Sequence, residues 1–272
     1  MNLFKNYLKK KLSPIIYTNV YQINSDDLFT KRNILLIGGA TGIGYAIAQK
    51  IISSGGSVLI TGRSIEKLQS AQTKLGNHCE ILQWDITNIE NGPYMLEKAI
   101  NQIGGEIDCL INCAAVWNDQ INFSTCTEKD WDSMMNTNLK GIYFITNVYA
   151  NRLLKKNRAG NILMISSERG LYPDDRPYGL SKAALNNYVQ ALSRRLVNHN
   201  IRVNALAPGW TATEHAYPLG DNNLYTNCTC SNRMMIPEEV AEVACFIISD
   251  AASCISGAII PCNLGNHIRS DW

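Results

Sequence analysis

From residue 33 onward, short apolar runs alternate with longer segments of helical periodicity. The runs predicted as strands are residues 33–37, 57–61, 80–84, 109–112, 161–166, 202–206 and 258–260. Most are apolar almost throughout, which is typical of parallel strands covered by helices on both faces. The segments predicted as helices are 42–53, 65–75, 93–103, 129–156, 178–198 and 237–249. This alternation predicts right-handed crossovers and a Rossmann-type α/β fold, a doubly wound parallel sheet of about seven strands.

The first thirty residues have a different pattern. Apolar side chains between Met1 and Leu12 alternate with four lysines, and no acidic residue precedes Asp26. One interpretation is a short basic amphipathic helix that contacts a membrane surface or another subunit. The other is an extension that packs on the domain or frays. No apolar run is typical of a secretory signal or long enough to span a bilayer. We therefore expect a basic extension over residues 1–30 and a single domain over residues 31–272.

Composition narrows the class of protein further. The chain has 272 residues, of which 46% are hydrophobic and 18% charged, with a formal net charge of +2. Such a balanced charge gives no reason to expect a nucleic acid partner. The nine cysteines are an odd number without framework spacing, which favours reduced thiols and a cytoplasmic location. Cys228-Thr-Cys230 lacks the second ligand pair of a zinc site, so we expect no metal.

A glycine-rich segment follows the first predicted strand directly. It reads Gly38-Gly-Ala-Thr-Gly42-Ile-Gly44 and leads into a helix. Residues without Cβ atoms allow a tight turn and a close approach to a pyrophosphate, whose charge the helix N-terminal amides would meet. A tight packing corner is the alternative. The position after the first strand of an alternating fold favours nucleotide binding.

Tyr178 and Lys182 are a candidate acid–base pair. Residues four apart on a helix lie on one face, about 5–6 Å apart at Cβ. An ammonium at that distance favours the phenolate, and so lowers a phenol pKa that is otherwise near ~10. By itself this spacing is common on solvated helices. Its meaning depends on the rest of the chain.

The glycine spacing and Tyr178-Gly-Leu-Ser-Lys182, in this order, resemble the single-domain branch of the short-chain dehydrogenase/reductase family. The resemblance covers about residues 33–265. Further segments that resemble family motifs are Asp85, Asn112-Cys-Ala-Ala115, Asn138-Leu-Lys-Gly141, Ser166-Ser167-Glu-Arg-Gly170, Pro208-Gly209 with Thr213, Ile255-Ser-Gly257 and Cys262-Asn-Leu-Gly265.

Several positions depart from the family pattern. Ile37 replaces the threonine usual before the first glycine. Cys113 replaces an asparagine, and Ala115 replaces a glycine, which narrows the floor beneath a cofactor. The segment 263–265 lacks the usual paired glycines. None of these changes removes a group with a chemical role.

The resemblance implies four catalytic residues. Tyr178 would exchange a proton with the substrate oxygen while NAD(P)H gives or takes a hydride, and Ser167 would orient the same oxygen. Lys182 would stabilise the phenolate and bind the nicotinamide ribose. Asn138 would position a water connecting Lys182 to solvent, although it could instead bend its helix. Ser166 competes with Ser167 for the serine role; the distance to Gly170 favours Ser167.

The resemblance also implies the cofactor contacts. Their positions here are Gly38, Thr41, Gly42, Ile43, Gly44, Arg63, Ser64, Asp85, Ile86, Asn112, Ala114, Tyr178, Lys182, Pro208, Gly209 and Thr213. Asp85 could alternatively begin a turn with Thr87. The second strand ends in Thr61-Gly-Arg63-Ser64 without the acid that binds ribose hydroxyls in NAD-selective members. Arg63 can bind a 2′-phosphate, which favours NADP(H). If Arg63 only covers the adenine, NAD(H) stays possible.

The sequence thus predicts an NADP(H)-dependent oxidoreductase that interconverts a ketone or aldehyde and an alcohol. Alternatives are a dinucleotide-binding regulator or scaffold and an isomerase or dehydratase that recycles its hydride. The resemblance implies a homotetramer or homodimer. Residues 211–236 lack periodicity and are predicted to form a lid over a small-molecule substrate. Trp117 and residues 168–176 are expected to border the same pocket.

Overall fold

The protein is described by a computed structural model, which covers residues 27–213, 224 and 226–268. Seven parallel strands form one sheet with the order β3-β2-β1-β4-β5-β6-β7. The strands are β1 Asn33–Ile37, β2 Ser57–Gly62, β3 Cys79–Gln83, β4 Cys109–Asn112, β5 Gly160–Ile165, β6 Ile201–Pro208 and β7 Ile259–Cys262. The predicted fold class is confirmed, and strand boundaries differ from the prediction by one or two residues at most ends.

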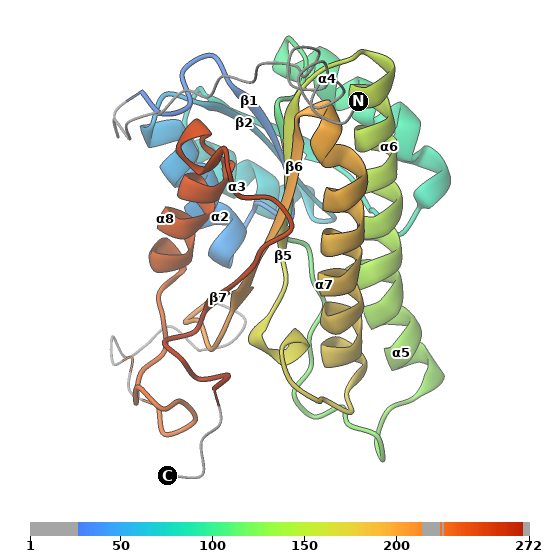
Figure 1. The fold of residues 1–272 in the computed structure, drawn as a ribbon, viewed down its shortest axis with the longest axis vertical. Helices are drawn as coiled ribbons and strands as arrows, with labels where there is room; N and C mark the ends of the chain where they lie inside the picture. The colour runs from blue at the N-terminus through green and yellow to red at the C-terminus, as the bar shows by residue number, and fades with distance from the viewer. Residues whose placement is uncertain (1–26, 214–223, 225, 269–272) are drawn as a thin grey trace, which may run out of the picture.

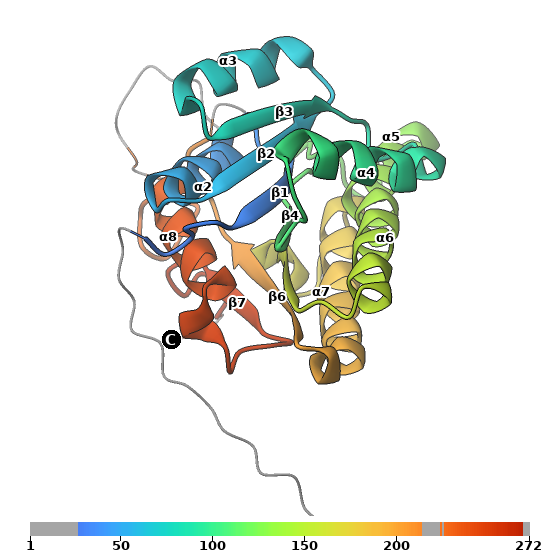
Figure 2. The same ribbon diagram turned by 90° about the horizontal axis from the view of Figure 1, so that it is seen from above.

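Helices cover both faces of this sheet (Figure 1, Figure 2). They are α2 Gly42–Ser53, α3 Ile65–Leu75, α4 Gly92–Ile103, α5 Glu128–Met135, α6 Ile142–Lys155, α7 Pro177–Leu196 and α8 Pro237–Ile248. Side chains of a strand point alternately to its two faces, which divides the core into two layers. Ile34 and Leu36 pack with α2, α3 and α8, whereas Leu35 and Ile37 pack with α4, α6 and α7.

The predicted helix over residues 129–156 is interrupted. Between α5 and α6 the residues Asn136–Gly141 form a π-helical turn. Such a turn adds a residue to the helical ladder and occurs frequently at functional sites. A Cβ at Gly141 would lie 2.7 Å from the carbonyl oxygen of Ile86. The glycine at the end of the turn therefore lets the helix approach the loop after β3 closely. In the sequence, the periodicity of apolar residues did not distinguish this π-helical turn from a continuous α-helix.

The expected N-terminal extension lies mostly outside the described residues. Its last residues belong to the folded unit, because Phe29 is buried and its N–H donates to the carbonyl oxygen of Ser54 at 2.9 Å. Leu28 packs against the core layer of α2, α3 and α8, to which Phe29 belongs. Within the part of the chain that the structure describes, none of the helices combines the length and the apolar character needed to cross a bilayer.

The predicted lid is described only at its two ends. Thr211 pairs with Met235 in an isolated parallel bridge. Met234 and Met235, near the end of the predicted lid, are almost fully buried, and Met235 belongs to the core layer of α2 and α8. They anchor the end of this segment and do not line the cavity described below.

Candidate active site

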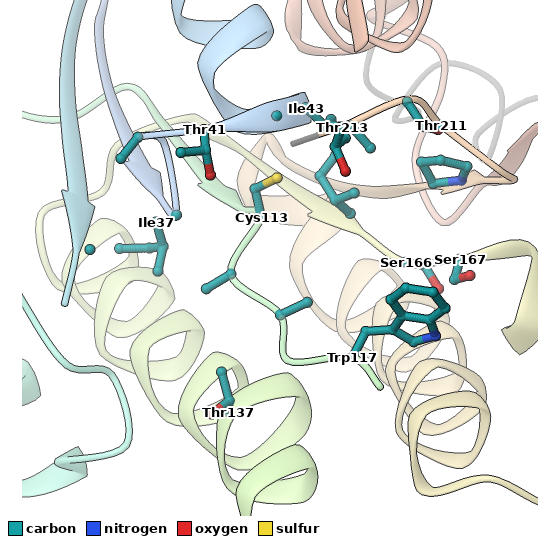
Figure 3. A pocket seen from close by; sticks show the side chains of 18 of the residues that line it. Ile37, Thr41, Ile43, Cys113, Trp117, Thr137, Ser166, Ser167, Thr211 and Thr213 are labelled. Carbon is teal, nitrogen blue, oxygen red and sulfur yellow. The ribbon is translucent and has the colours of Figure 1, made fainter. Parts of the chain in front are cut away.

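The candidate site lies where the winding of the sheet changes direction. β1 is hydrogen-bonded to both β2 and β4, and the chain crosses to opposite faces of the sheet after these strands. Ligands of open α/β sheets bind at the carboxyl ends of strands at such a point. A cavity of about 500 Å³ lies there. Figure 3 shows Ile37 and Thr41 toward one end of it, Cys113 near the middle, and Ser166, Ser167 and Trp117 toward the other.

The glycine turn after β1 forms one wall. Gly38 and Gly42 have φ angles of 82° and 55°, which favour glycine. A Cβ on Gly38 would lie 2.7 Å from the backbone nitrogen of Ala114. Helix α2 begins at Gly42, its N-cap residue Thr41 makes no side-chain capping bond, and its first turn has no acidic residue. Free amides at a helix N-terminus bind anions, so this wall fits a pyrophosphate.

Two predicted cofactor contacts do not line the cavity. A Cβ on Gly44 would lie 2.1 Å from the carbonyl oxygen of Gly38, so Gly44 allows α2 to pack on the turn. Asn112 is fully buried, and its Nδ2 donates to the hydroxyl of Thr146 on α6 at 3.0 Å. Both residues therefore support the wall of the site from behind. The family motifs include both positions, but a motif does not show whether a residue lies at the cavity surface or behind it.

The ends of β2 and β3 form the far end of the cavity. Arg63, Ser64, Asp85 and Ile86 line it, as predicted, and so does Lys67, which the sequence did not single out. Both basic side chains are exposed. Asp85 accepts hydrogen bonds from the N–H and hydroxyl of Thr87 at 2.9 and 2.8 Å through one oxygen, Oδ1. Asp85 therefore begins a turn and also lines the cavity.

Two buried polar atoms at this end have no hydrogen-bond partner. They are the hydroxyl oxygen of Thr61 and the indole nitrogen of Trp84, which find no partner among the described residues, and both residues line the cavity. Buried polar groups are normally satisfied. An adenosine moiety in this part of the cavity offers donors and acceptors to such atoms, so the residues present fit a dinucleotide. Trp84 carried no recognisable signal in the sequence.

Tyr178 and Lys182 lie one turn apart near the start of α7. The Nζ of Lys182 lies 5.5 Å from the centre of the Tyr178 ring and donates to the carbonyl oxygen of Ile165 at 2.8 Å. Burial lowers the pKa of Lys182 to about 8. Burial also raises the pKa of Tyr178 to about 12, although a hydrogen bond with Ser167 opposes this rise. The expected lowering of the Tyr178 pKa by Lys182 is therefore not observed.

The structure separates the two adjacent serines. Ser166 Oγ donates to Oδ1 of Asn186 at 2.6 Å and so ties β5 to α7. Ser167 Oγ accepts from the N–H of Arg169 at 3.2 Å and hydrogen-bonds to Tyr178. Both serines line the cavity. Of the two serines, Ser167 is the one whose hydroxyl acts on the Tyr178 phenol. The catalytic role chosen for it from the sequence stays a prediction.

Asn138 lies in the π-helical turn and is fully buried. Its Oδ1 accepts from the N–H of Val116 at 2.7 Å, and its Nδ2 donates to the carbonyl oxygen of Val116 at 2.8 Å. The same Nδ2 is 3.5 Å from the hydroxyl of Ser181 on α7. The side chain thus holds the loop after β4 and does not line the cavity.

Comparison with known proteins decides the family. Residues 38–267 match the family described as enoyl-(acyl carrier protein) reductase. The 3-oxoacyl-[acyl-carrier-protein] reductase of Aquifex aeolicus is 31% identical over 85% of this chain and 95% of its own length. The chain is a short-chain dehydrogenase/reductase.

Other relatives of this short-chain dehydrogenase/reductase have different named substrates. The gluconate 5-dehydrogenase of Gluconobacter oxydans is 29% identical over 86% of this chain and 94% of its own length. A solved structure of a short-chain type dehydrogenase/reductase from Mycobacterium ulcerans is 26% identical with a TM-score of 0.80, covering 89% of this chain and 91% of that one. The protein is accordingly an enzyme, an oxidoreductase of carbonyl and alcohol groups.

The departures from the family pattern are visible in the enzyme's cavity. Ile37, Cys113 and Ala115 all line it. Burial raises the pKa of the Cys113 thiol to about 11, so the thiol is neutral at neutral pH. In the C-terminal segment Leu264 adopts a φ of 53°, in the region where a glycine costs least. The predicted contacts Ala114, Pro208, Gly209, Ile43 and Thr213 also line the cavity.

The catalytic end contains a residue with no role implied by the resemblance. Glu168 is buried and lines the cavity directly after Ser167. Nδ2 of Asn263 donates to its Oε2 at 3.0 Å, and Nδ2 of Asn266 lies 3.2 and 3.1 Å from Oε1 and Oε2. Trp210 lines the same cavity after β6. The sequence did not suggest this network because its members are 95 and 98 residues apart.

Proposed function

We propose that this enzyme interconverts a ketone or aldehyde and an alcohol with NADP(H), using Tyr178 as the acid and base. One observation carries the proposal. Ser167, Tyr178 and Lys182 line the same cavity as the glycine turn at Gly38 and Gly42. A proton donor and a hydroxyl that orients the substrate oxygen would thus lie in reach of a ligand bound along that turn.

The proton chemistry follows from burial. A bound nicotinamide dinucleotide would supply or accept the hydride. Tyr178, with its pKa raised to about 12, keeps its proton at neutral pH and can donate it to an oxygen that gains negative charge during reduction. Ser167, already hydrogen-bonded to Tyr178, would donate a second hydrogen bond to the same oxygen.

Lys182 and Asn138 would act around this centre. Lys182 is 1% exposed and lines the cavity, so its ammonium can bind ribose hydroxyls and strengthen the acidity of Tyr178 once the cavity is filled. The side-chain amide of Asn138 is occupied by Val116 at both ends. A water that connects Lys182 to solvent would therefore be held by a main-chain carbonyl of the π-helical turn.

The preference for NADP(H) rests on charge at the far end of the cavity. Arg63 and Lys67 both line it, and the end of β2 has no acidic residue that would repel a 2′-phosphate. A guanidinium forms strong, geometrically specific hydrogen bonds with phosphate. Glu66 is the acidic residue nearest to Arg63 in the sequence, and its carboxylate accepts a hydrogen bond from the hydroxyl of Ser64 at 2.7 Å.

The cofactor proposal is tested by charge reversal. We expect Arg63→Asp to weaken NADPH binding by roughly 10–100-fold, since hydrogen bonds to charged groups contribute ~1.5–3 kcal/mol, and to leave NADH binding unchanged or improved. Lys74→Glu, an equal charge change on the exposed last turn of α3, is the matched control. Equal NADPH affinity in both variants, measured by fluorescence titration, would show that Arg63 does not contact the phosphate.

The reaction is tested by following NADPH absorbance with a panel of ketones, aldehydes and alcohols. Turnover with any of them supports the proposed reaction. Cofactor binding without turnover across the panel in both directions would favour the regulator or scaffold instead.

We also propose a homo-oligomer, a tetramer or dimer, assembled through α5, α6 and α7. Exposed large apolar side chains gather on these helices, namely Trp131, Tyr143, Phe144 and Leu180. Exposed apolar side chains on neighbouring helices support an interface there. Sedimentation equilibrium that gives only monomer at micromolar concentration would contradict it. A cytoplasmic location stays a prediction based on cysteine spacing.

A further inference from the structure

Glu168 brings a buried carboxylate to the catalytic end of the cavity. It is 3% exposed, and within residues 27–213, 224 and 226–268 its side-chain oxygens accept hydrogen bonds only from the neutral amides of Asn263 and Asn266. Among the described residues no lysine, arginine or histidine forms an ion pair with it. The neighbouring guanidinium of Arg169 is bound to Asp174 at 2.8 Å. A charge buried without an ion-pair partner calls for an explanation beyond packing.

The carboxylate lies beside the groups proposed to react. Glu168 follows Ser167 in the chain, and a Cβ on Gly209 would lie 2.8 Å from its Oε2. It therefore occupies the space between the catalytic serine and the loop after β6. A carboxylate has about four acceptor positions. Two amide nitrogens do not fill them, so capacity is left for a donor inside the cavity.

The remaining walls at this end include two indole rings and the side chain of Arg169. Trp117 follows β4, Trp210 follows β6, and both line the cavity. Figure 3 shows Trp117 toward the same end as Ser166 and Ser167. Aromatic walls with a few fixed polar groups orient a ligand that has apolar faces and a small number of polar substituents. A hydroxylated carbon skeleton meets both conditions, since its C–H faces suit indole rings and its hydroxyl groups suit the carboxylate.

We propose that Glu168 is a substrate-binding residue that accepts a hydrogen bond from a hydroxyl group on the carbon next to the reacting carbonyl. The substrate class is then uncharged α-hydroxy ketones and the vicinal diols formed by their reduction. This inference rests on the proposed function. A 3-oxoacyl thioester is disfavoured, because its second carbonyl brings only an acceptor toward the carboxylate. Anionic substrates are disfavoured by repulsion.

Two substrates that differ by one hydroxyl test the proposal without any mutation. We expect the kcat/KM for 2-hydroxycyclohexanone to exceed that for cyclohexanone by roughly 10–100-fold, the usual effect of a hydrogen bond to a charged group. The oxidation of 1,2-cyclohexanediol should exceed that of cyclohexanol in the same way. Ethyl acetoacetate, a 3-oxoacyl ester, should react no better than cyclohexanone.

Glu168→Gln then identifies the group responsible. The ratio of the two kcat/KM values should fall at least tenfold in this variant, because the amide is a weaker acceptor. Asn266→Ala, which removes a donor to Glu168 and keeps the carboxylate, should retain most of the ratio. If Glu168 only clamps the C-terminal segment, both variants lower the two kcat/KM values together and leave the ratio unchanged.

The outcomes separate this proposal from the function on which it rests. Turnover of cyclohexanone or ethyl acetoacetate without a preference for the hydroxy ketone leaves the oxidoreductase function intact and overturns the role of Glu168. Absence of turnover with every substrate and both cofactors overturns both. If Glu168→Gln does not fold, Glu168→Asp, which keeps the carboxylate but draws it back by one methylene, takes its place and should also lower the ratio. An unchanged ratio would overturn the role of Glu168.

Discussion

The two ends of the cavity are built by different means. The end beneath the glycine turn is shaped by backbone, because Gly38 and Gly42 adopt positive φ angles and neighbouring chain segments approach where Cβ atoms are absent. The catalytic end is shaped by side chains, since Ser167, Tyr178 and Lys182 supply the hydroxyl, the phenol and the ammonium.

The two ends also differ in how exposed their charged groups are. Arg63 and Lys67 are exposed cations, and they suit a phosphate that arrives from water. At the catalytic end burial determines the chemistry, because it raises the pKa of Tyr178 and lowers that of Lys182. In the proposed function, one end recognises the shape and charge of the cofactor, and the other exchanges a proton with the substrate.

The largest effect is expected from removing the phenol. Tyr178→Phe should lower kcat roughly 10²–10⁴-fold, the usual contribution of a positioned acid or base. NADPH affinity, measured by fluorescence titration, should change little because the glycine turn is intact. Tyr188→Phe is the control on the same helix, where the phenol donates to Asn147 at 2.7 Å and does not line the cavity. Substantial turnover in Tyr178→Phe with cofactor bound would refute the acid–base role.

A methyl group tests the backbone-built end. Gly38→Ala combines an unfavourable φ with a contact 2.7 Å from the Ala114 nitrogen, and should lower the free energy of unfolding by roughly 2–4 kcal/mol. NADPH binding should weaken with it. Gly104 has a φ of 78° in the left-handed helical region, and a Cβ there would have none of the described residues within 4 Å, so Gly104→Ala should cost only ~1–2 kcal/mol. Equal losses in urea unfolding would show that close approach at Gly38 is unimportant.

The buried ammonium predicts a dependence of stability on pH. Burial lowers the pKa of Lys182 from 10.5 to about 8 in the folded protein. Between pH 8 and 10.5 the unfolded chain therefore binds more protons than the folded protein, and the free energy of unfolding rises with pH. Relative to Lys182→Met, the natural protein should gain roughly 2–3 kcal/mol between pH 7 and 10.

The comparison with Lys182→Met is necessary because buried thiols act in the opposite direction. Burial raises the pKa of Cys79 and Cys245 to about 12, so their ionisation favours the unfolded chain above pH 9. These contributions cancel in the difference between the two proteins. A difference in unfolding free energy that is constant from pH 7 to 10 would mean that the Lys182 ammonium is not destabilised by burial.

The smallest effect concerns the C-terminal segment. Leu264 is 46% exposed with a φ of 53°, so Leu264→Gly should relieve ~1–2 kcal/mol of strain and lose somewhat less to chain flexibility. We expect a net gain near ~0.5 kcal/mol in unfolding free energy. Asn232 has the same φ, which asparagine tolerates, and Asn232→Gly should give no gain. A loss in both variants would show that flexibility outweighs strain.

The backbone-built end was largely predictable from the sequence. Glycine spacing after an apolar strand specifies the turn at Gly38 and Gly42, because few other residues adopt those φ angles. Arg63 could be recognised by its place at the end of β2. Lys67, in the first turn of α3, looks like any exposed helical lysine. The depth of Gly44 and Asn112 was also not predictable, since depth depends on how layers stack.

The catalytic end was predictable only for residues close in the chain. Tyr178 and Lys182 share a helix, and Ser167 lies eleven residues upstream of Tyr178. Glu168 obtains its partners from Asn263 and Asn266, across nearly a hundred residues. The pKa of Tyr178 was predicted in the wrong direction because sequence spacing reports a neighbouring charge and does not report burial.

The donors to Glu168 set a condition on synthesis. Asn263 and Asn266 follow Glu168 by 95 and 98 residues, so they are translated after the glycine turn and after β1 to β6. A nascent polypeptide that ends before them can complete β1 to β6 and the glycine turn, yet its Glu168 carboxylate has no amide to hold it. Such a shortened product would present the glycine turn before the carboxylate at the other end of the cavity is held in place.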